Sequence, residues 1–224
     1  MRIGVDLGGT KIEAIALNDM GAVLYRHRIP TPVADYIAIL NAIADLVFEI
    51  ERRIGLSGSV GIGTPGSLSP RTGLIRNSNS TVLNGKPLGR DISEILKRPV
   101  RLENDANCFA LSEAIDGAAK EAESVFGVIL GTGVGGGLVV RGSIIARRNR
   151  IAGEWGHNSM PWPNADEWPG PNCYCGKTGC IETFLSGPSL EKHFRAATMR
   201  DLSAKDIACA AEAQDPQALA TIEI

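Results

Sequence analysis

The sequence contains no run of apolar residues long enough to cross a bilayer as a helix. It also lacks an excess of either charge, because 23 Lys and Arg residues are balanced by 25 Asp and Glu residues, for a net charge of −2. This balance argues against nucleic acid or a membrane surface as a partner held by bulk charge. We also expect no signal peptide, since glycines and Asp6 interrupt the apolar residues of MRIGVDLGGT at once.

Histidine and cysteine are scarce, at three and five residues, and half of these eight gather between residues 157 and 180. Cys173, Cys175 and Cys180 form a C-x-C-x4-C pattern with two glycines between the last two cysteines. Thiolates that converge in so tight a loop suit tetrahedral zinc, which takes four nitrogen or sulfur ligands. His157 is the best fourth ligand, because the other two histidines lie in ordinary settings. The alternative is a disulfide or a set of free thiols.

Two glutamates, Glu154 and Glu182, bracket this cysteine loop. A structural zinc would hold their carboxylates in place, where they could accept hydrogen bonds from a polyol. If His157 gives one ring nitrogen to zinc, the other becomes a donor of fixed direction. The alternative is that both glutamates are solvated loop charges. A cysteine cluster of the metal-binding kind also fits a reducing compartment, so we expect a cytoplasmic protein.

The apolar patterning predicts a mixed α/β chain. Alternation and short apolar runs predict strands at 2–7, 11–17, 22–29, 59–63, 100–102, 124–130 and 138–140. Helical spacing predicts helices at 35–54, at 91–97 and from the ENDAN segment to about Ala119. The amide-rich loop 77–81 lies between these elements and either contacts a ligand or is simply solvated.

Two glycine-rich turns are candidates for phosphate binding. Residues 6–11, DLGGTK, lie between the first two predicted strands, where backbone N–H groups can cradle phosphate oxygens and Asp6 can hold magnesium. The alternative is a plain hairpin turn, and a Walker A loop is absent. Residues 131–137, GTGVGGG, fit a dinucleotide fingerprint, but that fingerprint requires a helix after the glycines. Because a strand is predicted there instead, we interpret this run as a second phosphate turn.

Asp105 lies at the junction of a predicted strand and the helix that follows it. One interpretation is helix capping, for which Asp and Asn are favoured. The other is a general base that takes the proton of a sugar hydroxyl as its oxygen attacks phosphorus. The sequence allows one residue of this segment to cap the helix while its neighbour is catalytic.

Five segments together resemble the ROK family of sugar kinases, which belongs to the actin/Hsp70/hexokinase superfamily. They are DLGGTK, ENDAN, GTGVGGG, GEWGH and CYCGKTGCIE. YRHRIPTP, NSNSTVLNGKPL and GEWGHNSMPW are most similar to bacterial fructokinases of this family, whereas LENDANCFALSEA and LGTGVGGGL are shared with N-acetylglucosamine kinases. The resemblance implies an actin-like (ribonuclease H-like) α/β fold with two α/β domains around a cleft. We expect the domains at 1–117 and 118–224.

The resemblance also implies an activity, ATP-dependent phosphorylation of a hexose, with D-fructose to fructose 6-phosphate as the first expectation and N-acetylglucosamine or glucose as alternatives. It implies Asp105 as catalytic base, a structural zinc on His157, Cys173, Cys175 and Cys180, magnesium on the phosphates and a possible homodimer. The implied sugar-binding residues are Asn79, Asn104, Asp105, Glu154, His157 and Glu182. The implied ATP-binding residues are Gly4, Val5, Asp6, Leu7, Gly8, Gly9, Thr10, Lys11, Thr132, Gly133, Val134, Gly135, Gly136, Gly137, Leu138, Val139 and Val140.

Members of the family are longer than this chain, which we therefore expect to be truncated in its C-terminal part. A sugar-binding remnant without turnover is one alternative function. A sugar-responsive regulator is another, although a first strand beginning at Arg2 leaves no room for a DNA-binding domain before it.

Overall fold

The computed structural model describes residues 1–145, 151–165 and 167–222 of the 224-residue chain. A five-stranded sheet forms the N-terminal part, in the order β3-β2-β1-β4-β7. Its strands are β1 (Arg2–Leu7), β2 (Lys11–Leu17), β3 (Val23–Pro30), β4 (Ser59–Thr64) and β7 (Val100–Asn104). The first three strands pair antiparallel as hairpins, whereas β1, β4 and β7 run parallel. The carboxyl ends of these parallel strands therefore share one edge of the sheet.

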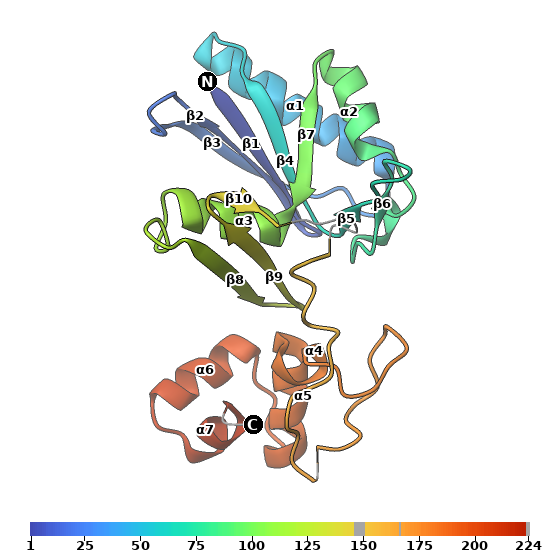
Figure 1. Ribbon diagram of the computed structural model, residues 1–224, viewed down its shortest axis with the longest axis vertical. Helices are drawn as coiled ribbons and strands as arrows, with labels where there is room; N and C mark the ends of the chain where they lie inside the picture. Colours follow the sequence, from blue (N-terminus) through green and yellow to red (C-terminus); the bar gives the residue numbers. More distant parts are fainter. Residues whose placement is uncertain (146–150, 166, 223–224) are drawn as a thin grey trace.

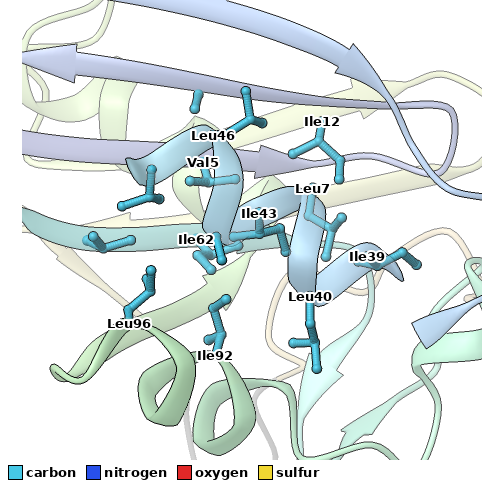
Figure 2. Packing of buried hydrophobic residues seen from close by; sticks show 14 of the residues in the cluster. Val5, Leu7, Ile12, Ile39, Leu40, Ile43, Leu46, Ile62, Ile92 and Leu96 are labelled. Carbon is cyan, nitrogen blue, oxygen red and sulfur yellow. The ribbon is translucent and has the colours of Figure 1, made fainter. Parts of the chain in front are cut away.

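Two helices cover the sheet and build the largest core, shown in Figure 2. Helix α1 (Tyr36–Ile54) begins after Asp35, whose side chain caps the Ala38 N–H, and ends at Gly55 in the left-handed conformation. Helix α2 (Leu88–Leu96) packs on the same core through Leu88, Ile92 and Leu96. The helical stripe predicted for α1 is buried from Leu40 to Ile50, which confirms the periodicity seen in the sequence.

A second sheet contains β8 (Ser124–Leu130), β9 (Val134–Val140) and the short β10 (Ser143–Ile144). Helix α3 (Asp105–Ile115) packs on it through a small core of Ala110, Ala114 and Val139. The prediction that residues 131–137 form one glycine turn is wrong, because β9 already begins at Val134. Here glycine permits close packing: a Cβ on Gly137 would lie 2.5 Å from the Ala106 carbonyl oxygen of α3.

Figure 1 shows the remaining helices at the end of the molecule opposite the N-terminus. They are α4 (Glu182–Leu185), α5 (Gly187–Thr198), α6 (Ala204–Glu212) and α7 (Pro216–Ile222). Phe194, Ile207, Ala211 and Ala218 form their own buried cluster. Among the described residues, no helix combines the length and the apolar character needed to cross a membrane.

The four helices between Glu182 and Ile222 were not among the predicted elements, whereas the other differences from the sequence expectation are small. Helix α2 begins at Leu88, three residues earlier than predicted, and α3 ends at Ile115, where the Asp116 and Gly117 N–H groups both turn back to the Ser112 carbonyl. The two-residue strands β5 (Ser67–Leu68) and β6 (Ile75–Arg76) and the 3-10 helix Thr81–Leu83 were not predicted. A domain boundary after Gly117 stays a prediction; α3 precedes it and packs on the sheet that follows it.

Candidate functional site

The shared edge of the parallel strands gathers the first candidate residues. The sheet register places Asp6 of β1 opposite Gly63 of β4, and Thr64 of β4 opposite Asn104 of β7. Asp105 follows Asn104 directly and opens α3. Ligands of open α/β sheets bind outside the carboxyl ends of parallel strands, so this edge is where chemistry is expected.

Asn104 and Asp105 have different tasks. The Asn104 side chain accepts the Asn107 N–H at 3.1 Å and is the N-cap of α3, while its amide donates to the Gly66 carbonyl at 2.8 Å. The same amide donates to Asp105 Oδ1 at 3.0 Å, and the Ala106 N–H donates to that oxygen at 2.8 Å. Asn104 therefore caps the helix and orients the carboxylate of Asp105, a role that leaves Asp105 available for chemistry.

The Asp105 carboxylate is solvent-accessible yet holds its proton more tightly than an ordinary aspartate. Desolvation by the surrounding protein raises its pKa above the usual value, and the negative charge of Asp6 raises it further, whereas the Ala106 N–H and the Asn104 amide lower it. Desolvation likewise raises the pKa of Asp6. Two exposed carboxylates close enough to influence each other suit a site for cations and for proton transfer.

Glu154, His157 and Glu182 join this group from the C-terminal half. Desolvation raises the pKa of Glu154, His157 lowers it, and the negative charges of Asp105 and Glu182 raise it. Glu154 therefore lies within electrostatic reach of residues from both halves of the chain. Glu182, at the start of α4, is only 9% exposed, and its Oε2 accepts the Val134 N–H at 2.9 Å.

Four side chains can hold a metal: His157, Cys173, Cys175 and Cys180, whose donor atoms all lie within 4.8 Å of one another. Cys173 Sγ is 3.5 Å from His157 Nδ1, and Cys175 Sγ is 3.6 Å from Cys180 Sγ. Tetrahedral zinc with ordinary bond lengths places sulfur and nitrogen about 3.5 Å apart and two sulfurs about 3.8 Å apart. The donor set therefore fits zinc, and the three cysteines are free thiols with no disulfide between them.

Tyr174 is a site residue that the sequence reasoning missed. Its hydroxyl lies 3.1 Å from His157 Nε2, and the two rings meet edge to face with centroids 5.1 Å apart. Desolvation, the negative charge of Glu182, the neighbouring Cys173 and a hydrogen bond to Glu182 raise the pKa of Tyr174 to about 12. Its position between two cysteines of the loop was the available signal, because the side chain must emerge beside the metal ligands.

Strand β9, which follows the second glycine turn, packs against the loop that carries Glu154 and His157. A Cβ on Gly153 would lie 1.9 Å from the Gly136 carbonyl oxygen, and a Cβ on Gly156 would lie 2.3 Å from that of Val134. The Trp155 indole N–H donates to the Gly135 carbonyl at 2.8 Å. Residues 153–156 therefore lie directly on β9, and this contact sets the position of Glu154.

The first glycine turn is a tight hairpin in which the Gly8 N–H donates to the Lys11 carbonyl at 3.0 Å. A Cβ on Gly9 would lie 3.2 Å from Ser80 Oγ, so the amide-rich loop lies against this turn, with Asn79 exposed beside it. ATP binding by the two turns stays a prediction. Val5, Leu7 and Val139 are buried in the hydrophobic cores, so their side chains serve packing, and the Val134 N–H already has Glu182 as its acceptor.

Comparison with known proteins identifies the family. The sequence matches the ROK family over residues 2–224. The chain belongs to the ROK family. Among its ROK relatives is an N-acetyl-D-glucosamine kinase of Yersinia pseudotuberculosis serotype O:3, which is 42% identical over 227 residues covering all of this chain and 75% of the relative.

Solved ROK structures share the fold. A ROK hexokinase from Thermus thermophilus matches with a TM-score of 0.84 and 36% identity over 98% of this chain and 72% of that protein. A ROK glucokinase from Streptomyces griseus, solved with glucose and AMPPNP, matches with a TM-score of 0.78 and 28% identity over 98% of this chain and 73% of that protein. These ROK matches confirm the predicted actin-like ATPase fold and support a sugar kinase; they do not support fructose specifically.

Proposed function

We propose that this protein transfers the γ-phosphoryl group of ATP to a hydroxyl of a hexose, with Asp105 as general base. The observation that supports the proposal is electrostatic: the charge of Asp6 acts on Asp105, and the charges of Asp105 and Glu182 act on Glu154. Asp105 also lies between the two glycine turns in sequence. A carboxylate base, further carboxylates for sugar hydroxyls and N–H-rich turns for phosphates are the parts that phosphoryl transfer requires.

In this mechanism Asp105 takes the proton of the acceptor hydroxyl as the hydroxyl oxygen bonds to the γ-phosphorus. The bond between that phosphorus and the bridging oxygen of ADP breaks, and ADP leaves with the electron pair. Asn104 keeps the carboxylate in place through its 3.0 Å hydrogen bond. Asn104, Glu154, His157 and Glu182 hold sugar hydroxyls, and Asn79 supplies a further contact. Asp6 is the carboxylate best placed to hold magnesium, which would supply positive charge to the phosphates.

Zinc would be held by His157 Nδ1 and the three thiolates, and it would supply rigidity rather than chemistry. With Nδ1 on the metal, the His157 ring keeps one orientation and Nε2 carries the proton. The zinc-bound loop would then hold Glu154 and Glu182, the two carboxylates that flank it in sequence, in fixed positions beside the sugar.

The sugar is a separate part of the proposal. We infer N-acetyl-D-glucosamine as the first acceptor to test, because a relative at 42% identity is named N-acetyl-D-glucosamine kinase. Fructose, expected first from the sequence, becomes an alternative together with glucose and mannose. A homodimer and a cytoplasmic location remain predictions.

The test compares Asp105→Asn with the unaltered chain. ADP release from Mg-ATP is measured with each of the four sugars, and sugar binding is measured by calorimetry. Removal of a general base should lower kcat by about 10²- to 10⁴-fold while sugar binding persists. Asp45→Asn, at an exposed position on α1, is the matched control and should leave both quantities unchanged.

Three outcomes separate the alternatives. Unchanged turnover in Asp105→Asn would remove Asp105 as the base. Sugar binding without ADP release in the unaltered chain would favour a binding remnant over a kinase. Strongest turnover on fructose would keep the mechanism and overturn the inference of N-acetyl-D-glucosamine.

A further inference from the structure

The Tyr174 hydroxyl lies beside Nε2 of His157, the ring nitrogen that is not part of the proposed metal site. His157 Nδ1 faces Cys173 Sγ at 3.5 Å, inside the donor set, whereas Nε2 faces the Tyr174 hydroxyl at 3.1 Å. An imidazole with Nδ1 on a metal carries its proton on Nε2, which can donate one hydrogen bond. In this structure the Tyr174 oxygen takes that bond.

The proposed function gives the same donor to a sugar hydroxyl. Tyr174 and the sugar therefore compete for one N–H, and both cannot accept it with good geometry. The Tyr174 hydroxyl lies 3.1 Å from His157 Nε2, the nitrogen proposed to donate to a sugar hydroxyl, so the phenol lies at the proposed acceptor site. Tyr174 thus stands where an incoming hydroxyl must arrive.

The contacts of Tyr174 allow it to leave. The residue is 83% exposed, and its ring meets the His157 ring edge to face rather than lying in a core. Its backbone is anchored on either side by Cys173 and Cys175, two of the proposed metal ligands. A rotation of the side chain can therefore free Nε2 while the loop stays in place.

We propose that Tyr174 is a displaceable residue of the acceptor site, which accepts the His157 Nε2 hydrogen bond in the sugar-free protein and yields it to a sugar hydroxyl. This inference rests on the proposed function, because it assigns that donor to the sugar. Tyr174 would therefore lower the affinity for any sugar, because displacing the phenol offsets part of the free energy of sugar binding.

The test is Tyr174→Phe, which keeps the ring and removes the hydroxyl, together with its hydrogen bonds to His157 Nε2 and to Glu182. Sugar affinity of the zinc-loaded chain, measured by calorimetry without ATP, should become about 2- to 10-fold tighter, the range that corresponds to one net hydrogen bond. Tyr25→Phe is the matched control, because the Tyr25 hydroxyl donates to Glu49 at 3.1 Å on another surface and its loss should leave sugar affinity unchanged.

A second readout needs no sugar. The ¹⁵N–¹H resonance of His157 Nε2, one of only three histidine side chains, should shift in sugar-free Tyr174→Phe relative to the unaltered protein. An unmoved resonance would show that the hydrogen bond is absent and would overturn the proposal.

The affinity outcomes also separate this proposal from the one on which it rests. Unchanged affinity in Tyr174→Phe would overturn the displacement alone, and weaker affinity would overturn it by showing that the phenol binds the sugar directly. Structural damage would not tighten binding, so a gain in affinity supports displacement. Failure of the unaltered protein to bind any of the four sugars would overturn the proposed function and the displacement together.

Discussion

Gly153→Ala tests whether β9 sets the position of the acceptor loop. The Cβ that alanine adds would lie 1.9 Å from the Gly136 carbonyl oxygen and 2.5 Å from its carbon, whereas real Cβ contacts stay beyond 3.0 Å. The loop backbone must therefore retreat from β9 by about 1 Å, since two main chains meet there and no flexible side chain can yield. Gly153 is not among the glycines of positive φ, so the expected effect is steric alone.

The size of the effect follows from that displacement. Glu154 is the next residue and His157 lies three further on, so both move with the loop. A misplacement of about 1 Å at groups that orient a substrate can reduce turnover about 100-fold. Overpacking at the same point should lower the free energy of unfolding by about 1–3 kcal/mol.

The assay is steady-state ADP release, giving kcat and KM, with zinc content and thermal unfolding measured on the same preparation. Gly61→Ala on β4 is the matched control, because a Cβ there has nothing within 4 Å. Gly153→Ala should keep its fold and its zinc while kcat/KM falls about 100-fold below that of Gly61→Ala. Equal kcat/KM in the two folded variants would refute the reasoning that contact with β9 positions Glu154 and His157.

Three further predictions address the metal, the base and the core. Cys180→Ser should lower both the zinc content and the sugar affinity, because His157 loses its fixed orientation. Metal analysis and calorimetry on the same preparation measure these two quantities, and a loss of zinc with unchanged sugar affinity would contradict the prediction. The raised pKa of Asp105 means that this base in the free enzyme takes up a proton at a higher pH than an ordinary aspartate, whose pKa is about 3.9. The value of kcat/KM should therefore fall with decreasing pH along a limb above about pH 3.9, and a limb at or below that pH would contradict the prediction. Ile43→Ala, at a fully buried position of α1, should cost about 2–5 kcal/mol in denaturant unfolding, against about 0.5 kcal/mol or less for Ile37→Ala at an exposed position of the same helix; similar losses would contradict the packing of Figure 2.

The elements whose patterns depend on their own residues were predictable. The alternation in β1 and β2 and the helical stripe of α1 predicted the bounds of these elements to within a residue. An element that buries one face has apolar residues at the period of that element, so its extent can be predicted from its own residues. The cysteine spacing likewise placed the donor set, which the structure brings together with His157.

What the sequence did not reveal depends on contacts between distant segments. Gly135 and Gly137 read as turn residues, yet they lie in β9, where Gly137 lets α3 approach closely. Nothing local to Glu182 indicates that the Val134 N–H, 48 residues away in sequence, is its partner. The position of Tyr174 between Cys173 and Cys175 placed it near the metal ligands, but only the folded loop shows its hydroxyl 3.1 Å from His157 Nε2.

The hydrogen bond from the Val134 N–H to Glu182 has a thermodynamic consequence. Val134 begins the strand that leaves the proposed phosphate turn, and Glu182 is a proposed sugar ligand at the end of the cysteine loop. A ligand that tightens one side of this bond also orders the other side. Allosteric linkage then requires that the nucleotide change the affinity for the sugar by the same factor as the sugar changes the affinity for the nucleotide. If nucleotide binding shifts the Val134 N–H, the coupling between the two substrates would pass through one buried carboxylate, Glu182.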